Sequence, residues 1–184
     1  RTPQYCFPAG NHPYEPGFVN KAKENFAEMK KELRESMAGQ INKTRKPSAF
    51  DDTPEERQKA YEERWQEGGY LFLYDDLLIN EDSNETAAEF IRSKIGDIVE
   101  DPETAQKLMP TYHWGTKRQI LDTNYYETYN RDNVSLIDVR KNPIEEVTSK
   151  GIKTSDGETE LDTIVFATGY DGMTGPLFRM NIHV

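Results

Sequence analysis

The sequence predicts an α/β protein in which an acidic helical half is followed by a half rich in β-strands. Apolar residues recur at helical spacing between Phe18 and Ile98, and they form short β-branched runs after Thr111. Acidic side chains gather in the first half, where residues 51–103 hold 17 acidic and 5 basic residues in a chain of net charge −10. The two halves of the chain therefore differ in both their predicted secondary structure and their charge.

The helical half begins after residues 1–17, which contain four prolines and are expected to form an ordered loop. One amphipathic helix should follow, with an apolar face made of Phe18, Ala22, Phe26, Met29, Leu33 and Met37. Residues 39–52 are polar and contain a proline, so a loop is expected there. A second helix should start at Thr53-Pro54, because Thr53 and Glu56 match a capping box, and it should end at Gly68-Gly69.

Three further segments complete the helical half. Residues 71–79 are apolar and short, which fits either a helix or a strand. A helix that opens at Asp82 or Ser83 should bury one face, formed by Ala87, Ala88, Ile91, Ile95 and Ile98. A short helix should begin at residues 101–103 and be closed by Pro110.

The β half is expected to contain several short strands. These are residues 134–139, 145–148, 151–154 and 177–184. Turns are expected at residues 149–151 and 155–157. Residues 161–167 form an apolar, β-rich run that is typical of a strand buried on both faces of a parallel sheet.

Composition and missing motifs exclude several classes of function. The acidic charge argues against nucleic acid and anionic membranes as partners, and no apolar run is long enough to span a bilayer. The chain has no GxGxxG loop and no Walker loop, so it carries no dinucleotide fingerprint of its own. The histidines have no metal-ligand spacing, so no metal site is expected; they are His12, His113 and His183.

The ends of the chain and its single cysteine bear on its context. The sequence starts at Arg1 and ends in the alternating run 177–184, so we expect an internal piece of a longer protein. Cys6 excludes an internal disulfide and is expected to be a small buried thiol. A single cysteine fits a reducing compartment, and the expected location is therefore the cytoplasm.

The most specific segment is residues 161–171, an apolar run that ends in Ala167, Thr168 and Gly169. Small residues and a glycine at a strand end allow a ligand to approach the backbone closely. On the residues alone, a buried strand followed by a turn is the better explanation. Residues 166–170, Phe-Ala-Thr-Gly-Tyr, however resemble a motif of flavin monooxygenases, at the point where the chain passes between the NADPH and FAD domains.

Other segments narrow this resemblance to the Baeyer–Villiger monooxygenases. Residues 115–118, Gly-Thr-Lys-Arg, and then residues 125–134 resemble a block of that family in the same order. Residues 1–5 resemble the family segment just after the second strand of its NADPH-binding domain. Residues 91–95 and 101–104 are similar to its helical insertion, so the resemblance to cyclohexanone, phenylacetone and steroid monooxygenases covers nearly the whole chain.

The resemblance implies a fold and an activity. The chain would comprise a helical insertion, the C-terminal strands of a Rossmann-like NADPH-binding domain, and the strand that crosses toward the FAD domain. The implied divisions are residues 1–16, 17–110, 111–160 and 161–184. The longer enzyme would use FAD, NADPH and O₂ to convert a ketone to an ester or lactone. The isolated chain is expected to be inactive, to bind neither cofactor well and to self-associate.

The resemblance also implies site residues. Arg1, with Thr2 beside it, and Lys117 would recognise the 2′-phosphate of NADPH, for which an arginine offers a planar fork. Arg118 would face the nicotinamide and stabilise negative charge that develops during oxygen insertion. Residues 167–169 would approach a cofactor. Without the resemblance, Arg1 and Lys117 are ordinary surface charges, and Arg118 is an arginine paired with an acidic neighbour.

Two other functions are also compatible with the sequence. One is a heteroatom-hydroxylating flavin monooxygenase, which shares the motif at residues 166–170; the helical insertion and the Lys117-Arg118 block argue against it. The other is a non-enzymatic, acidic helical interaction module.

Five further aromatic residues are expected to pack in the core, with the tyrosine hydroxyls hydrogen-bonded. These residues are Trp65, Trp114, Tyr125, Tyr126 and Tyr129.

Overall fold

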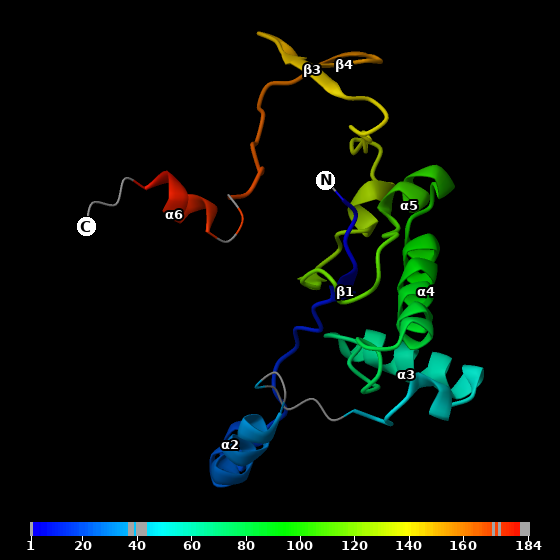
Figure 1. Cartoon of the computed structure of the whole chain (residues 1–184), viewed down its shortest axis with the longest axis vertical. Helices are drawn as coiled ribbons and strands as arrows, with labels where there is room; N and C mark the ends of the chain where they lie inside the picture. The colour runs from blue at the N-terminus through cyan, green and yellow to red at the C-terminus, as the bar shows by residue number, and fades with distance from the viewer. Residues whose placement is uncertain (1, 37–38, 40–43, 171, 173, 181–184) are drawn as a thin grey trace. The chain divides into compact units, whose positions relative to one another are not determined.

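A computed structural model describes residues 2–36, 39, 44–170, 172 and 174–180. Its helices and strands follow one another along the chain as Figure 1 shows. The chain divides into two compact units, Arg1–Leu136 and Ile137–Val184. The division into four parts expected from the sequence remains a prediction.

Helix α3 (Pro54–Glu67) forms where the sequence predicts it. The Thr53 hydroxyl accepts a hydrogen bond from the Glu56 amide at 3.3 Å, and the Glu56 carboxylate accepts one from the Thr53 amide at 3.0 Å. This is a capping box, and it satisfies two backbone donors that the first turn leaves free. The helix ends at Gly68, as expected.

Helices α4 (Glu81–Ile98) and α5 (Pro102–Leu108) also follow the expected pattern. Helix α4 starts slightly earlier than predicted, because the Asn80 side chain caps it by accepting from the amides of Asp82 and Ser83. Its predicted inner face is buried except for Ile98, which is half-buried. Asp101 caps α5 through the amide of Thr104, and the buried Pro110 follows it.

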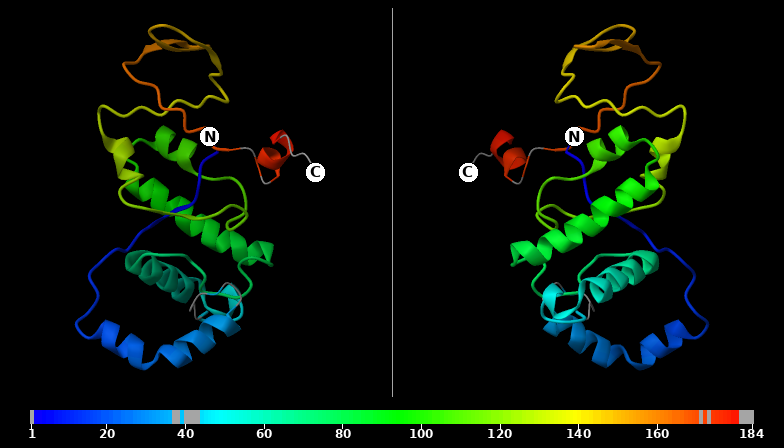
Figure 2. Two further views of the ribbon diagram at one scale, coloured as in Figure 1. Left: turned by 90° about the vertical axis from the view of Figure 1, so that its left-hand side faces the viewer. Right: turned by 90° about the vertical axis from the view of Figure 1, so that its right-hand side faces the viewer.

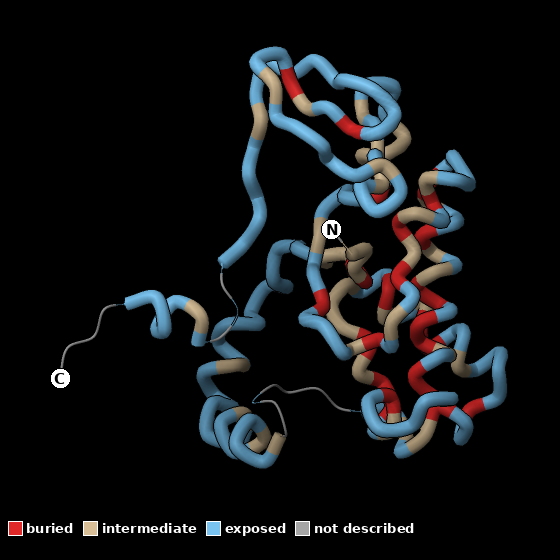
Figure 3. Tube along the Cα trace, turned by 45° about the horizontal axis from the view of Figure 1, so that its top comes forward, coloured by how far each residue is buried: buried red, intermediate tan, exposed pale blue. Residues whose placement is uncertain are grey.

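The core of the first unit lies between α3, α4 and β1 (Cys6–Pro8). Phe7 and Ile91 are fully buried, and the rings of Tyr61 and Phe90 pack at 5.3 Å between centroids. Figure 2 shows α3 and α4 as neighbouring helices in both views. Figure 3 shows that buried residues gather along these elements. The core of this unit is therefore rich in aromatic side chains.

The segment of residues 71–79, expected to be a helix or a strand, is neither. It is irregular, with a single parallel bridge between Lys46 and Tyr74, and its buried residues are Leu71, Leu73, Tyr74 and Leu77. Side chains replace a regular backbone ladder here. The Asp76 carboxylate accepts hydrogen bonds from Ser48 Oγ at 2.7 Å, Ser83 Oγ at 2.6 Å and the Ala49 amide at 3.1 Å. These bonds tie the short 3₁₀ helix η1 (Ala49–Asp51) to the start of α4.

The sequence predicts one of the two strand pairings of the chain's described part and not the other. The hairpin strands β3 (Ile144–Val147) and β4 (Gly151–Thr154) are antiparallel and lie where they were predicted, and β5 (Gly157–Glu160) adds a third strand. By contrast β1 pairs in parallel with β2 (Ile120–Asp122), with Cys6 opposite Ile120, and neither strand was predicted. Each has three residues, and more than a hundred residues separate them, so no local pattern identifies them.

The loop after β1 and the end of α3 cross at two glycines. The amide of Gly69 donates to the Pro8 carbonyl at 3.1 Å. A Cβ on Gly10 would collide with the carbonyl oxygen of Glu67, and a Cβ on Gly68 would collide with the backbone of Gly10. The two backbones therefore touch with no side chain between them.

The single helix expected after residue 17 is in fact two helices. Helix α1 (Phe18–Glu24) and helix α2 (Phe26–Glu35) are separated at Asn25, a poor helix former whose ψ angle is 11°. No residue of either helix is buried, although the apolar face is present. Met37, the last residue of the predicted face, lies outside the described residues.

Two predicted strands of the β half are not formed, and the described part of a third is mostly helical. Residues 134–139 are irregular, and so are residues 161–167, where Val165 is 83% exposed. Residues 177–179 belong to the short helix α6 (Gly175–Arg179), and residues 181–184 lie outside the described part. A strand needs a neighbour to receive its backbone hydrogen bonds. Among the described residues of this unit, only the Leu161 amide finds such a partner, the Lys150 carbonyl at 2.9 Å, and no strand pairs with residues 161–167.

Among the described residues, no helix combines the length and the apolar character needed to cross a membrane. The longest, α4, has 18 residues and an acidic first turn. The short 3₁₀ helix η2 (Glu127–Asn130) completes the elements of the first unit.

Candidate functional site

Lys117 and Arg118 lie in the first unit, between a tight turn and β2. The turn is closed by hydrogen bonds from the Thr116 amide and hydroxyl to the His113 carbonyl, at 3.3 and 2.8 Å. Gly115 has a φ of 85°, in the left-handed region that favours glycine, and a Cβ there would strike the Leu78 side chain. The Gly-Thr-Lys-Arg motif therefore has a local structural basis for its first residue.

The turn is anchored to α4 by the buried Trp114. The Trp114 amide donates to Asn84 Oδ1 at 2.9 Å, and Asn84 Nδ2 donates back to the Trp114 carbonyl at 2.7 Å. The indole also packs on Phe72, with 5.2 Å between ring centroids. The prediction that Trp114 is a packing anchor is confirmed, and it fixes the start of the cationic segment.

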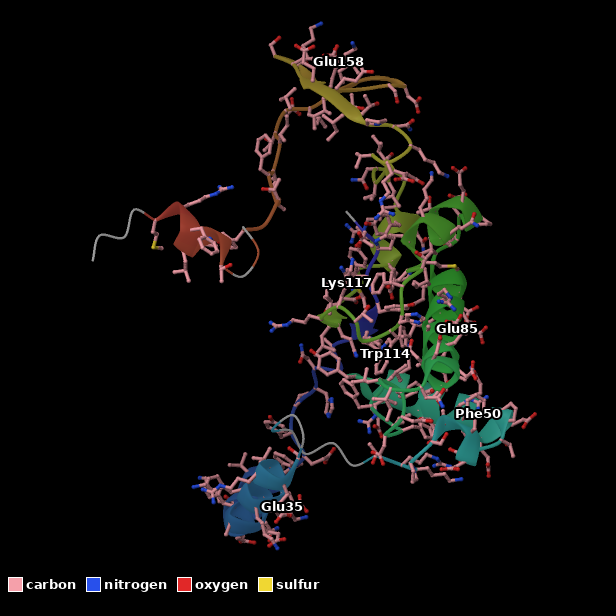
Figure 4. The ribbon with its side chains drawn as sticks, in the orientation of Figure 1. Glu35, Phe50, Glu85, Trp114, Lys117 and Glu158 are labelled. Carbon is pink, nitrogen blue, oxygen red and sulfur yellow. The ribbon has the colours of Figure 1, made fainter. Side chains whose placement is uncertain are left out.

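Both cations are exposed, and neither is neutralised by a carboxylate of the described chain. Arg118 has no hydrogen bond or ion pair with any described residue. The ammonium of Lys117 lies 4.5 Å from the centroid of the Tyr112 ring, a cation–π contact. In Figure 4 Lys117 and Trp114 are labelled on the same unit. Two adjacent cations free of acidic partners suit an anionic ligand, and these residues therefore fit a nucleotide phosphate.

The segment that carries Thr2 runs beside the segment that carries Lys117. The Ile120 amide donates to the Tyr5 carbonyl at 3.4 Å, and Tyr112 Oη donates to Gln4 Oε1 at 2.7 Å. Thr2 is half-buried. Arg1 lies outside the described residues. Sequence reasoning missed both Gln4 and Tyr112, because a single polar or aromatic residue at these positions carries no recognisable spacing.

Ala167, Thr168 and Gly169 belong to the second unit. All three are exposed, and Gly169 has a φ of 82°. This left-handed conformation is one that glycine adopts without steric cost, which agrees with the close backbone approach suggested by the motif. Lys117 and Arg118 belong to the first unit.

Of the tyrosines near β2, Tyr126 packs in the core as expected and Tyr129 is half-buried, whereas Tyr125 is 41% exposed, so the expectation of core packing is wrong for Tyr125. Tyr126 is buried, its hydroxyl donates to the Gln4 carbonyl at 3.0 Å, and it accepts from the Cys6 amide at 3.2 Å. Tyr129 Oη donates to Tyr125 Oη at 3.1 Å. Burial raises the pKa of the Cys6 thiol to about 11, and the thiol is accordingly protonated and unreactive at neutral pH.

A hollow of about 340 Å³ lies at the carboxyl ends of β1 and β2. Asp122 and Tyr126 line it, and burial raises the pKa of the Asp122 carboxyl. None of the residues that the sequence assigns to the site lines this hollow. The candidate site is therefore the cationic segment at the opposite, amino-terminal side of the strand pair.

Comparisons with known proteins extend over the whole chain, although no protein-family model matches it. A 2-oxo-Δ³-4,5,5-trimethylcyclopentenylacetyl-CoA monooxygenase of Pseudomonas putida is 41% identical over 187 aligned residues, which are 99% of this chain and 34% of the relative. A phenazine N-monooxygenase of Lysobacter antibioticus and a cyclohexanone 1,2-monooxygenase of an Acinetobacter species are each 40% identical with the same coverage.

Solved structures agree with these relatives. An oxidised steroid monooxygenase bound to NADP superposes with a TM-score of 0.89 and 42% identity, over 97% of this chain and 35% of that one. A cyclohexanone monooxygenase in an open crystal structure superposes with a TM-score of 0.88 and 40% identity, over 96% of this chain and 35% of that one. The chain thus spans about a third of the length of the curated relatives it matches.

Proposed function

The chain belongs to the Baeyer–Villiger monooxygenases, of which it represents about a third of the length, and on this premise we propose a function for the enzyme that contains it. That enzyme converts a ketone to an ester or lactone with O₂, NADPH and FAD. When bound, FAD and NADPH supply the redox chemistry of the reaction. The buried thiol of Cys6 supports a reducing compartment such as the cytoplasm.

The observation that carries the proposal is the pair of exposed cations at the Trp114 turn. Arg118 has no acidic partner among the described residues, so its guanidinium is available to a ligand. Such a permanently charged fork stabilises negative charge that develops on oxygen during the insertion. An arginine already bound to a carboxylate would lose much of this effect.

The remaining site residues bind the cofactors in this proposal. Lys117, together with Arg1 and Thr2, recognises the 2′-phosphate that distinguishes NADPH from NADH. The adjacency of residues 4–5 to Tyr112 and Ile120 supports this, because it brings the two segments to one side of the unit. Ala167, Thr168 and Gly169 form a backbone surface without bulky side chains, which suits close contact with a cofactor.

The test of the function uses the full-length enzyme. It should be incubated with a cyclic ketone, NADPH and O₂, and the products should be identified by mass spectrometry. We expect the lactone, with one NADPH consumed for each lactone formed. NADPH consumption that yields no ester or lactone from a panel of cyclic, linear and aryl ketones would contradict the proposal.

A second candidate is oxygen transfer to nitrogen. It rests on the relative named phenazine N-monooxygenase, which matches this chain as well as the ketone-named relatives do. The helical insertion is part of that alignment too, so it does not separate the two reactions. A phenazine and a tertiary amine should therefore be assayed beside the ketones. An N-oxide formed faster than any ester would favour the second candidate.

A further inference from the structure

Lys117 meets the face of an aromatic ring that is itself held on several sides. Tyr112 is half-buried, and the Lys117 ammonium lies 4.5 Å from its ring centroid. The Tyr112 hydroxyl donates to Gln4 Oε1 at 2.7 Å. Its carbonyl accepts from Tyr5 Oη at 2.7 Å, and the two rings meet edge to face at 5.3 Å. The ring is therefore a fixed platform.

The platform is connected to the elements around it. Tyr5 directly precedes β1, and its hydroxyl also accepts a long hydrogen bond, 3.4 Å, from Arg92 of α4. Gln4 stands only two residues after Thr2. The contacts of Tyr112 thus link the segment that carries Lys117 with Gln4 and Tyr5, which follow Thr2 closely along the chain.

A lysine benefits from such a platform. Its ammonium is a point charge on a flexible four-carbon stem, and holding it in one place costs rotamer entropy. A contact that already restrains the ammonium lowers that cost when an anion binds. The Arg118 side chain has no equivalent contact with a described residue.

We propose that Tyr112 is a positioning residue, which holds the Lys117 ammonium over its ring for the 2′-phosphate of NADPH and is itself held by Gln4. The proposal rests on the function proposed above. It adds that the cation–π contact contributes to the discrimination between NADPH and NADH. Tyr112 does not touch the reacting atoms.

The geometry is tested first without reference to activity. In the full-length enzyme, lysines are reductively methylated with ¹³C-formaldehyde, which keeps their charge. The Lys117 methyl signal is assigned as the one lost in Lys117→Arg. A proton above an aromatic ring resonates upfield, so this signal should lie upfield of those of ordinary exposed lysines, and Tyr112→Phe should retain the shift. A Lys117 signal at the ordinary position in the unaltered protein would overturn the proposal, whatever the variants do.

The second test compares NADP⁺ and NAD⁺ affinities by titration calorimetry. Tyr112→Leu should weaken NADP⁺ by roughly two- to fivefold, the value of an exposed cation–π contact, and leave NAD⁺ unchanged. Tyr112→Phe should keep the ring and lose less. Tyr14→Leu alters an exposed tyrosine that stacks on Phe18, and it serves as the matched control.

The outcomes separate the two proposals. If Lys117→Ala leaves NADP⁺ affinity unchanged, the 2′-phosphate assignment fails, although the upfield signal can still be present. If Lys117→Ala weakens NADP⁺ but Tyr112→Leu binds both nucleotides as the unaltered enzyme does, Tyr112 does not position Lys117. Equal losses for NADP⁺ and NAD⁺ in Tyr112→Leu would assign the tyrosine a structural role only and overturn the proposal.

Discussion

The two units of the chain differ in what their apolar residues contact. In the first unit, aromatic and aliphatic side chains from α3, α4 and β1 pack together, and Phe7, Leu71 and Ile91 are fully buried. In the second unit the buried described residues are only Gly151 and Thr154, while Phe178 is 86% exposed. Periodicity in a sequence indicates an apolar face, but the face is buried only where its partner is available.

The largest expected effect is a loss of stability that follows substitution in the core of the first unit and not in the second unit. Ile91→Ala should lower the free energy of unfolding of the 184-residue chain by about 2–5 kcal/mol, because it leaves a cavity in a fully buried position. Val165→Ala, at an 83% exposed position in the second unit, should change it by less than about 0.5 kcal/mol. Urea unfolding followed by far-UV circular dichroism measures both.

Ile79→Ala is the matched control, since Ile79 is 86% exposed in the same unit as Ile91. The unfolding of the first unit is also visible by fluorescence, because both tryptophans, Trp65 and Trp114, belong to it. A loss in Val165→Ala comparable with that in Ile91→Ala would show that the second unit builds a core of its own.

The next effect concerns catalysis at the surface of the first unit. In the full-length enzyme, Arg118→Ala should reduce ester formation by about 10²–10³, the usual contribution of a donor aimed at developing charge. Hydride acceptance from NADPH should persist, and unfolding should be unaffected because Arg118 is exposed. Rapid-mixing spectra and product analysis measure the two steps. Near-normal ester formation in Arg118→Ala would show that Arg118 has only a structural role. Arg118→Lys should restore little of the ester formation, because lysine lacks the planar fork of arginine.

Lys117→Ala should give a smaller, cofactor-selective effect. Loss of one charge-assisted contact should weaken NADPH relative to NADH by roughly 10- to 150-fold, or about 1.5–3 kcal/mol. The measurement is the ratio of kcat/KM values for the two cofactors. Parallel losses for NADPH and NADH would show that the ammonium does not contact the 2′-phosphate.

The smallest effect is a pH dependence within the first unit. Hydrogen bonds from Arg45 and Tyr74, together with an ion pair to Lys46, hold the pKa of the buried Asp52 well below its usual range. Because the folded-state pKa is depressed, this stabilisation is complete above the unfolded pKa of about 3.9 and is lost as the pH falls toward the folded value. Asp52→Asn should cost about 1–3 kcal/mol at pH 7 and less at pH 3. Urea unfolding at both pH values tests this, and a cost that is independent of pH would contradict it.

Local chemistry made part of the fold predictable. The capping box at Thr53 and Glu56 fixed α3 within a residue, and the turn chemistry around residues 149–151 located β3 and β4. The pairing of β1 with β2 was not predictable, because each strand is short and its partner is distant along the chain. The strand expected at residues 161–167 failed for the related reason that burial on two faces requires neighbours which the described unit does not contain.

The candidate site was also only partly predictable from the sequence. Lys117 and Arg118 were identified through a family resemblance, and the structure adds that no described carboxylate neutralises them. Their roles remain predictions. Tyr112 and Gln4 escaped notice, because the contact of a ring with an ammonium five residues away arises from the turn at Gly115 and has no signature in spacing.

The backbone crossing of Gly10 and Gly68 has a consequence for how this region tolerates sequence change. At either position even a methyl group would overlap main-chain atoms of the other segment, and main chain does not move aside as a flexible side chain does. No second substitution elsewhere relieves such an overlap. Glycine should therefore be required at position 10 whatever the residue at position 68 is, and the reverse, so the two positions should not covary. A mutational library of the enzyme would therefore recover glycine alone at both positions, while the neighbouring Asn11 and Glu67, whose side chains are exposed, would accept many residues.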